Sequence, residues 1–165
     1  LAEARTQIET ALALDPAFEI GLVARGRLEL QTGSRDKAVR DLLAGTTANP
    51  SYAQALLLLG AAHYENGDTE AARQAMQNAD RMDPNDAVAA SFATAVAIDA
   101  YEADGAIESA REAMRRARAR GGDFHSLGAN RAEGSTLNGA YRLKGLDAWG
   151  GYYAGAVFDP FGGAG

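Results

Sequence analysis

Cysteine is absent from the 165 residues of this chain. Its absence excludes disulfide bonds, cysteine-ligated zinc, iron–sulfur clusters and a thiol nucleophile. No apolar run approaches the roughly 20 residues that a membrane-spanning helix needs, so we expect no membrane insertion. Basic residues are outnumbered: 16 Lys and Arg stand against 22 Asp and Glu, a net charge of -6. This sign argues against nucleic acid as a partner.

Motifs of catalysis and cofactor binding are missing as well. The sequence has no phosphate-binding glycine loop, no H-E-x-x-H and no G-x-S-x-G. Its two histidines stand without a second ligand nearby; we expect His63 to pack at a helix or groove edge and His125 to lie in a loop. The sequence therefore predicts no catalytic residue, no metal site, no cofactor and a chain that is not an enzyme.

Proline is scarce but regularly placed, because Pro16, Pro50 and Pro84 lie 34 residues apart. Before each of them, a small, a large apolar and a second small residue share one face of a helix. These sets are Ala4, Ile8 and Ala11; Ala38, Leu42 and Gly45; and Ala72, Met76 and Ala79. Gly33 and Gly67 stand five residues before the second and third sets, where they predict tight turns with positive φ. Each unit is then a helix, a turn, a second helix and a stop before proline.

This pattern resembles the tetratricopeptide repeat, which has a 34-residue period. The resemblance implies an all-α fold, a right-handed solenoid of stacked antiparallel helix pairs over about residues 1–124. An unrelated helical bundle is the alternative, but it gives no reason for a constant proline interval. The expected units are a partial repeat at 1–18 and full repeats at about 19–52, 53–86 and 91–124.

The third repeat is expected after a slip of about four residues. Tyr101, Gly105 and Ala110 reproduce the spacing of His63, Gly67 and Ala72. On this register, Gly105 would be the turn glycine.

Residues 125–165 differ in composition, since 121–165 hold 12 of the 19 glycines and seven of the 12 aromatic residues. We expect a capping helix within 136–153, packed on the third repeat, and a Gly-rich tail. A degenerate fourth repeat is the alternative, because four residues repeat the spacing of Ala38, Leu42, Gly45 and Pro50. They are Ala148, Tyr152, Gly155 and Pro160.

The resemblance further implies a protein-interaction module, a scaffold or adaptor that binds a peptide or helix of a protein partner in an apolar concave groove. The first helices of the repeats would line this groove with Ile20, Val23, Arg27, Leu30, Gln54, Leu57, Ala61, Tyr64 and Phe92. The alternative is a structural array within a larger cell-envelope or assembly protein, whose groove is covered by its own tail or by a second copy. Self-association through the exposed end of the array also stays open.

Two further points concern charge and location. Five arginines fall within residues 111–120; we interpret them as the solvated outer face of a helix rather than as a nucleic-acid patch. The chain begins with Leu1 rather than Met, so a signal peptide would not be visible. Cytoplasm and periplasm or cell envelope both stay open.

Overall fold

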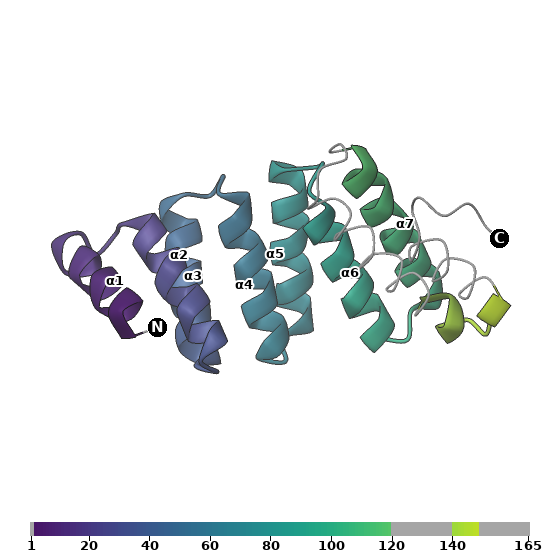
Figure 1. The fold of residues 1–165 in the computed structure, drawn as a ribbon, viewed down its shortest axis with the longest axis horizontal. Helices are drawn as coiled ribbons and strands as arrows, with labels where there is room; N and C mark the ends of the chain where they lie inside the picture. Colours follow the sequence, from purple (N-terminus) through teal and green to yellow (C-terminus); the bar gives the residue numbers. More distant parts are fainter. Residues whose placement is uncertain (1, 120–139, 149–165) are drawn as a thin grey trace. The chain divides into compact units, whose positions relative to one another are not determined.

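The computed structural model describes residues 2–119 and 140–148, and all regular structure in these ranges is helical (Figure 1). The expected all-α class is confirmed for this part of the chain. The structure divides into two compact units, Leu1–Pro84 and Asn85–Gly165. Each unit is described by itself.

The first unit consists of five helices. They are α1 (Ala2–Leu14), α2 (Glu19–Gln31), α3 (Arg35–Ala48), α4 (Ala53–Glu65) and α5 (Thr69–Met82). Short turns join α2 to α3 and α4 to α5, so each of these pairs is antiparallel; α4 also packs on α3, and α1 packs on α2. The unit is therefore a stack of helix pairs, as expected.

The second unit contains one long helix pair, α6 (Ala87–Asp99) and α7 (Ala103–Ala119). A short helical turn at 140–143 and a second one that starts at residue 147 complete its described part. Asp86 caps α6, because its side chain accepts a hydrogen bond from the backbone of Val88 at 2.9 Å.

The 34-residue interval runs through both units without a slip. Helices α2, α4 and α6 begin at residues 19, 53 and 87. The turns that follow them have positive φ at Gly33 (77°), Gly67 (85°) and Tyr101 (60°). The expected four-residue slip is therefore wrong: Tyr101 adopts the left-handed conformation that usually requires glycine, and Gly105 lies inside α7.

These turns share one hydrogen-bond pattern, the Schellman motif. At the first, the Gly33 amide donates to the Leu30 carbonyl at 3.1 Å and the Ser34 amide donates to the Glu29 carbonyl at 2.8 Å. The same two bonds recur at residues 67–68 and 101–102. In each case the next helix begins two residues after the left-handed residue.

A fourth copy of this turn occurs at Gly145, where φ is 73°. The Gly145 amide donates to the carbonyl of Arg142 and the Leu146 amide to that of Tyr141, both at 2.9 Å. The alternative of a degenerate fourth repeat places Ala148 with Ala38, and the two residues differ in burial. Ala148 is exposed, whereas Ala38 is fully buried.

Close packing inside each helix pair depends on small residues. A Cβ added to Gly26 would lie 2.6 Å from Leu42 Cγ, and one added to Gly60 would lie 2.8 Å from Met76 Cε. At the equivalent places of the third pair, 34 residues further on, stand Thr94 and Ala110, both fully buried. Each crossing thus combines one larger and one smaller side chain.

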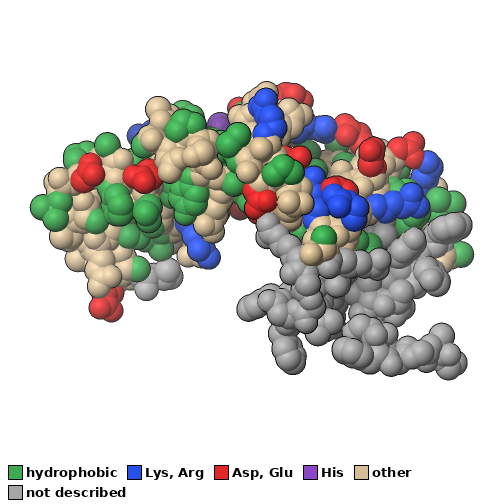
Figure 2. Space-filling view, turned by 90° about the horizontal axis from the view of Figure 1, so that it is seen from above, with side chains coloured by type: hydrophobic (Ala, Val, Ile, Leu, Met, Phe, Trp, Pro, Cys, Tyr) green, Lys and Arg blue, Asp and Glu red, His purple; other side chains and the backbone are tan. Residues whose placement is uncertain are grey.

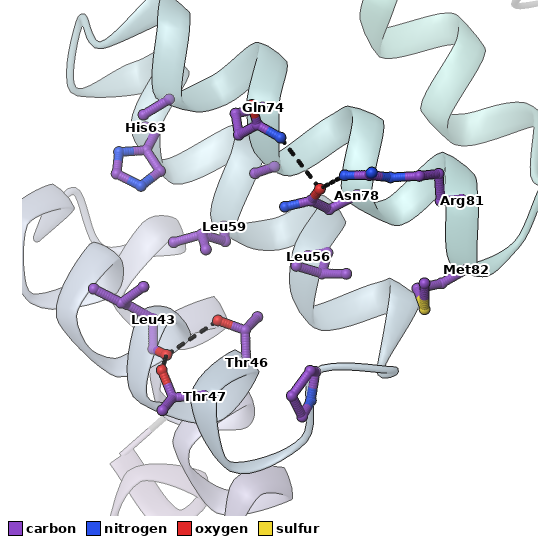
Figure 3. A pocket seen from close by; sticks show the side chains of 13 residues that line it. Leu43, Thr46, Thr47, Leu56, Leu59, His63, Gln74, Asn78, Arg81 and Met82 are labelled. Atoms are coloured by element: carbon purple, nitrogen blue, oxygen red, sulfur yellow. Dashed lines mark hydrogen bonds between the residues drawn. The ribbon is translucent and has the colours of Figure 1, made fainter.

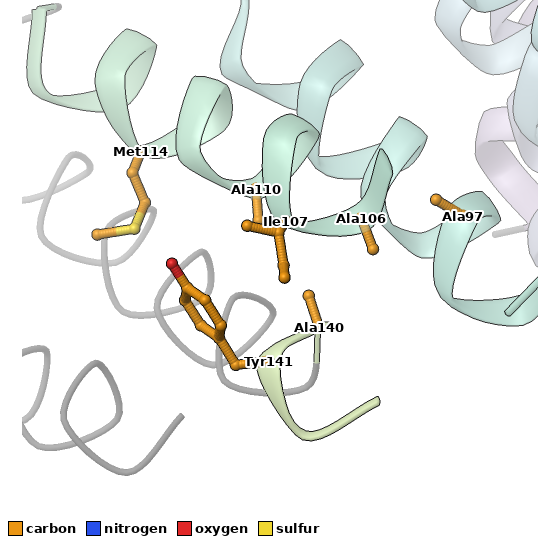
Figure 4. Packing of buried hydrophobic residues seen from close by; sticks show 7 residues of the cluster. All are labelled: Ala97, Ala106, Ile107, Ala110, Met114, Ala140 and Tyr141. Atoms are coloured by element: carbon orange, nitrogen blue, oxygen red, sulfur yellow. The ribbon is translucent and has the colours of Figure 1, made fainter. Parts of the chain in front are cut away.

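The core of the second unit includes residues from the C-terminal part of the chain (Figure 4). Ala140 and Tyr141 are buried against Ile107 and Met114 of α7. The Arg111 guanidinium donates to the Tyr141 hydroxyl at 2.5 Å and lies 5.7 Å from the ring centroid. Of the predicted cap at 136–153, the part at 140–148 is placed on the third helix pair; the remainder lies outside the described residues.

Candidate functional site

The predicted groove residues of the first unit form two rows on α2 and α4. Ile20, Arg27 and Gln54 are exposed. The others, apart from Val23, are half-buried, namely Leu30, Leu57, Ala61 and Tyr64. These seven residues are called the α2–α4 stripe below. The stripe offers mostly apolar surface with Arg27 and Gln54 as its polar members.

Two of the predicted residues do not belong to the stripe. Val23 is only 5% exposed and lies in the core, where a Cβ at Gly45 would approach its Cγ2 to 2.8 Å. It therefore holds α2 against α3 instead of contacting a ligand. Phe92 is half-buried on α6, in the second unit.

A hollow that the sequence did not predict lies on the first unit and has a volume of about 560 Å³ (Figure 3). Helices α3 and α5 form its two walls and α4 forms its floor. Its lining is Leu43, Thr46, Thr47, Pro50, Leu56, Leu59, His63, Ala71, Gln74, Ala75, Asn78, Arg81 and Met82. We call it the α3–α5 groove.

The base of the α3–α5 groove is apolar. Leu56 and Leu59 of α4 are 7% and 6% exposed and close the floor. On the two walls, Leu43 and Met82 leave 52% and 48% of their surface in solvent. Large apolar side chains that are exposed above a buried apolar floor are typical of an interaction surface.

Hydrogen-bond donors occupy the α5 wall of the groove. The Gln74 side-chain amide donates to Asn78 Oδ1 at 3.2 Å, and the Arg81 guanidinium donates to the same oxygen. Arg81 is exposed, and no carboxylate of the described ranges forms an ion pair with it. Thr46 and Thr47 on the α3 wall instead bond to the Leu43 carbonyl at 3.0 and 2.7 Å.

His63 is half-buried on α4, as a packing role requires, and it lies at the edge of the α3–α5 groove rather than of the predicted concave groove. Its side chain is 19% exposed, and Nδ1 lies 3.9 Å from Asp68 Oδ2. Within 2–119 and 140–148, no group of His, Asp and Glu is arranged to hold a metal ion. In the same ranges no helix is long and apolar enough to cross a membrane.

A charged cluster joins α1, α2 and α3. Arg25 donates to both carboxylate oxygens of Asp41 and to Glu9, and the hydrogen bond to Asp41 raises its pKa. Glu29 is 5% exposed, and its Oε2 has no hydrogen-bond partner among the described residues. Burial, and then the charge of Asp41, raise the pKa of Glu29.

Three arginines of α7, namely Arg111, Arg115 and Arg116, donate hydrogen bonds within their own unit. Arg115 and Arg116 both donate to Glu112, and these bonds lower the Glu112 pKa to about 2. Arg116 is 9% exposed and also donates to the Asp86 carbonyl at 3.1 Å. On the face shown in Figure 2, basic side chains lie among acidic ones. Arg111 and Arg115 are exposed, as the expected solvated helix face requires, but Arg116 is buried and does not belong to such a face.

Comparison with known proteins identifies the repeat. Residues 23–87 match the family model of the tetratricopeptide repeat. The assignment to the tetratricopeptide repeat thus rests on residues 23–87. The crystal structure of MamA resembles it with a TM-score of 0.75 and 22% identity, over 92% of this chain and 83% of that one. The comparison with curated proteins finds no match.

Two further solved tetratricopeptide-repeat structures share the fold. The Sgt2 TPR domain from Aspergillus fumigatus has a TM-score of 0.66 and 20% identity, over 81% of this chain and 83% of that one. PcrH, in complex with the chaperone binding region of PopD, has a TM-score of 0.58 and 23% identity, over 84% and 90%.

The repeat pattern shows which helices carry each of the two surfaces of the first unit. In tetratricopeptide-repeat terms, α2 and α4 are the first helices of their repeats, and α3 and α5 are the second helices. The α2–α4 stripe therefore belongs to the first helices, whereas the walls of the α3–α5 groove belong to the second ones. Sequence reasoning missed the groove because its lining comes from three helices; the available signal was Leu43 and Met82, apolar residues outside the small-large-small sets.

Proposed function

We propose that this chain is a non-catalytic protein-interaction module, which binds a peptide or helix of a protein partner on the α2–α4 stripe. The observation that carries the proposal is the row of half-buried apolar side chains on the first helices of tetratricopeptide repeats. PcrH, which has the same fold, has been solved with a bound region of another protein.

The chemistry of the stripe favours a largely apolar segment. Leu57, Ala61 and Tyr64 are partly covered already, so a ligand would remove their remaining apolar surface from water at little cost in side-chain entropy. Tyr64 provides the large, rigid aromatic surface that is common at binding hot spots. Arg27 and Gln54 are exposed and would orient the segment through its polar groups.

The test compares the intact chain with Tyr64→Ala and Leu57→Ser. Partners are recovered by affinity capture, and their affinities are then measured by calorimetry with purified components. We expect each substitution to weaken binding by about tenfold or more. Glu70→Ala on α5 is the matched control, since Glu70 is exposed and lies outside the stripe.

Two outcomes would contradict the proposal. Binding that is equally strong in the wild type and in both stripe variants would place the partner elsewhere. A dimer in sedimentation that dissociates in Tyr64→Ala would show that a second copy covers the stripe, which is the structural alternative.

A further inference from the structure

The α3–α5 groove differs from the α2–α3 and α4–α5 pairs because large apolar side chains on its walls remain exposed. In the helix pairs, side chains such as Leu42 meet a glycine of the partner helix and are fully buried. Leu43, one residue further along α3, and Met82 at the end of α5 instead remain about half exposed. The groove volume of about 560 Å³ falls within the range of roughly 300–1,000 Å³ that ligand sites have.

The charge of the groove is opposite to that of the chain. The chain carries 22 Asp and Glu and a net charge of -6, yet none of the groove residues is acidic. Arg81 is the one cationic side chain among the described lining residues, and the His63 imidazole at the groove edge lies 3.9 Å from Asp68 Oδ2. A segment that enters this groove therefore meets local positive charge on an otherwise acidic protein.

Arg81 is oriented for a carboxylate ligand. Its guanidinium is exposed at the α5 wall and donates to Asn78 Oδ1 of the same helix. A guanidinium has five N–H donors, so most of its donors remain available while one is used for orientation. Arginine held in this way binds a carboxylate in a planar, bidentate manner.

We propose that the α3–α5 groove is a second docking site, which binds an amphipathic acidic segment of a partner protein. Apolar side chains of the segment would cover Leu43, Leu56 and Met82, and a carboxylate would pair with Arg81. This site is separate from the α2–α4 stripe, because it lies along the second helices of the repeats. The two sites would allow the chain to hold two different segments.

The experiment uses a displayed library of random peptides of about 16 residues. The library is selected on the intact chain and depleted on a Leu43→Asp/Arg81→Glu variant, so that only peptides which need the groove survive. Both substituted residues are exposed, and circular dichroism verifies that the variant is folded. We expect surviving peptides to be enriched in Asp and Glu and in apolar residues.

The affinities of single peptides then distinguish an effect of the charge at the groove from an effect of the net charge of the protein. We expect Arg81→Glu to weaken binding by about tenfold or more, and Leu43→Asp to do the same. Arg5→Glu on α1 is the matched control, since it makes the same charge change on an exposed residue that lies outside both the groove and the stripe. It should leave the affinity unchanged.

Three results would overturn the proposal. Survivors without acidic enrichment would show that the groove does not select by charge. An equal loss in Arg5→Glu and Arg81→Glu would show a general charge effect. Self-association of the wild type that disappears in Arg81→Glu would show that the groove contacts a second copy of this chain.

Discussion

Both units contain a crossing of two antiparallel helices, but the larger side chain at the crossing comes from a different helix in each unit. In the first unit the helix that precedes the turn contributes glycine, and the helix that follows contributes Leu42 or Met76. In the second unit the preceding helix contributes Thr94 and the following helix contributes Ala110. At these equivalent positions the larger side chain therefore stands on the following helix in the first unit and on the preceding helix in the second.

The two units also contain one carboxylate each whose pKa is shifted, and the two shifts have opposite directions. Glu29 of the first unit is buried and has an unpartnered oxygen, and its pKa is raised. Glu112 of the second unit is held by Arg115 and Arg116, and its pKa is lowered to about 2. Ionisation of Glu29 therefore lowers the stability of the first unit, whereas ionisation of Glu112 raises the stability of the second unit.

The largest expected loss of stability comes from changing the sizes of the two residues that meet at the α2–α3 crossing. Gly26→Thr places a Cβ 2.6 Å from Leu42 Cγ and should cost about 3 kcal/mol by overpacking. Leu42→Ala alone should cost about 2–5 kcal/mol by leaving a cavity. The double variant reproduces Thr94 and Ala110, so its loss should be well below the sum of the two.

Hydrogen exchange of amides in α2 and α3 measures these losses within the first unit of the intact chain. If the losses of the two single variants simply added in the double variant, the inferred coupling between the two side-chain sizes would be contradicted. In that case the volumes at residues 26 and 42 would be independent, and the third pair would owe its residues to some other contact.

The turn residues give the next largest effect. Tyr101 has a φ of 60° and is 82% exposed, so Tyr101→Gly should remove backbone strain and stabilise the second unit by about 1 kcal/mol. Gly67→Tyr is the matched reverse change and should destabilise the first unit by a similar amount. Chemical denaturation of each variant, followed by exchange at residues 96–106, provides the measurement. A destabilised Tyr101→Gly would mean that the ring itself contributes to the turn.

A smaller effect is expected from the buried carboxylate. Because the folded-state pKa of Glu29 is raised, the folded state binds the proton more tightly, and stability falls as pH rises above about 4.3, the ordinary value. Glu29→Gln should therefore raise the melting temperature at pH 7 and leave it nearly unchanged at pH 4. Glu70→Gln, at an exposed site, should show no such trend. A melting temperature that is lowered equally at both values would refute the assignment.

Glu112 should give the smallest effect, with the opposite sign. Its pKa is lowered to about 2, so its contribution is complete above the ordinary value of about 4.3 and is lost as pH falls toward 2. Glu112→Gln should lower the melting temperature slightly at pH 7, and the difference should vanish near pH 2. The effect should also shrink in high salt, since the Arg115 side of the pair is exposed.

The helix boundaries of the first unit could largely be predicted from its glycine and proline positions. Gly33 and Gly67 mark the turns that the structure has, and α3 and α5 end just before Asn49-Pro50 and Asp83-Pro84. The third pair was misaligned because Tyr101 gives no sign of a left-handed backbone, while Gly105 stands where a turn glycine was expected. The conformation there is imposed by the helices on either side, and single-residue propensity does not report it.

The candidate sites were harder to predict than the fold. Helical spacing placed Ile20, Leu57 and Tyr64 on accessible rows, but it also placed Val23 there, and Val23 is buried against α3. The side of a helix that faces its neighbour depends on crossing geometry, which spacing alone does not define. For the same reason the α3–α5 groove, built by residues of three helices, was not predicted.

The shared turn geometry also bears on how such an array gains or loses repeats. The turns at Gly33 and Gly67 have the same backbone and hydrogen bonds, and a helix begins at the same distance after each. Removal of residues 35–68 would join Ser34 to Thr69 and regenerate one such turn, with Gly26 opposite Met76 in place of Leu42. Recombination between two repeats of this gene therefore needs no new loop sequence, and the array can be shortened or duplicated in whole periods.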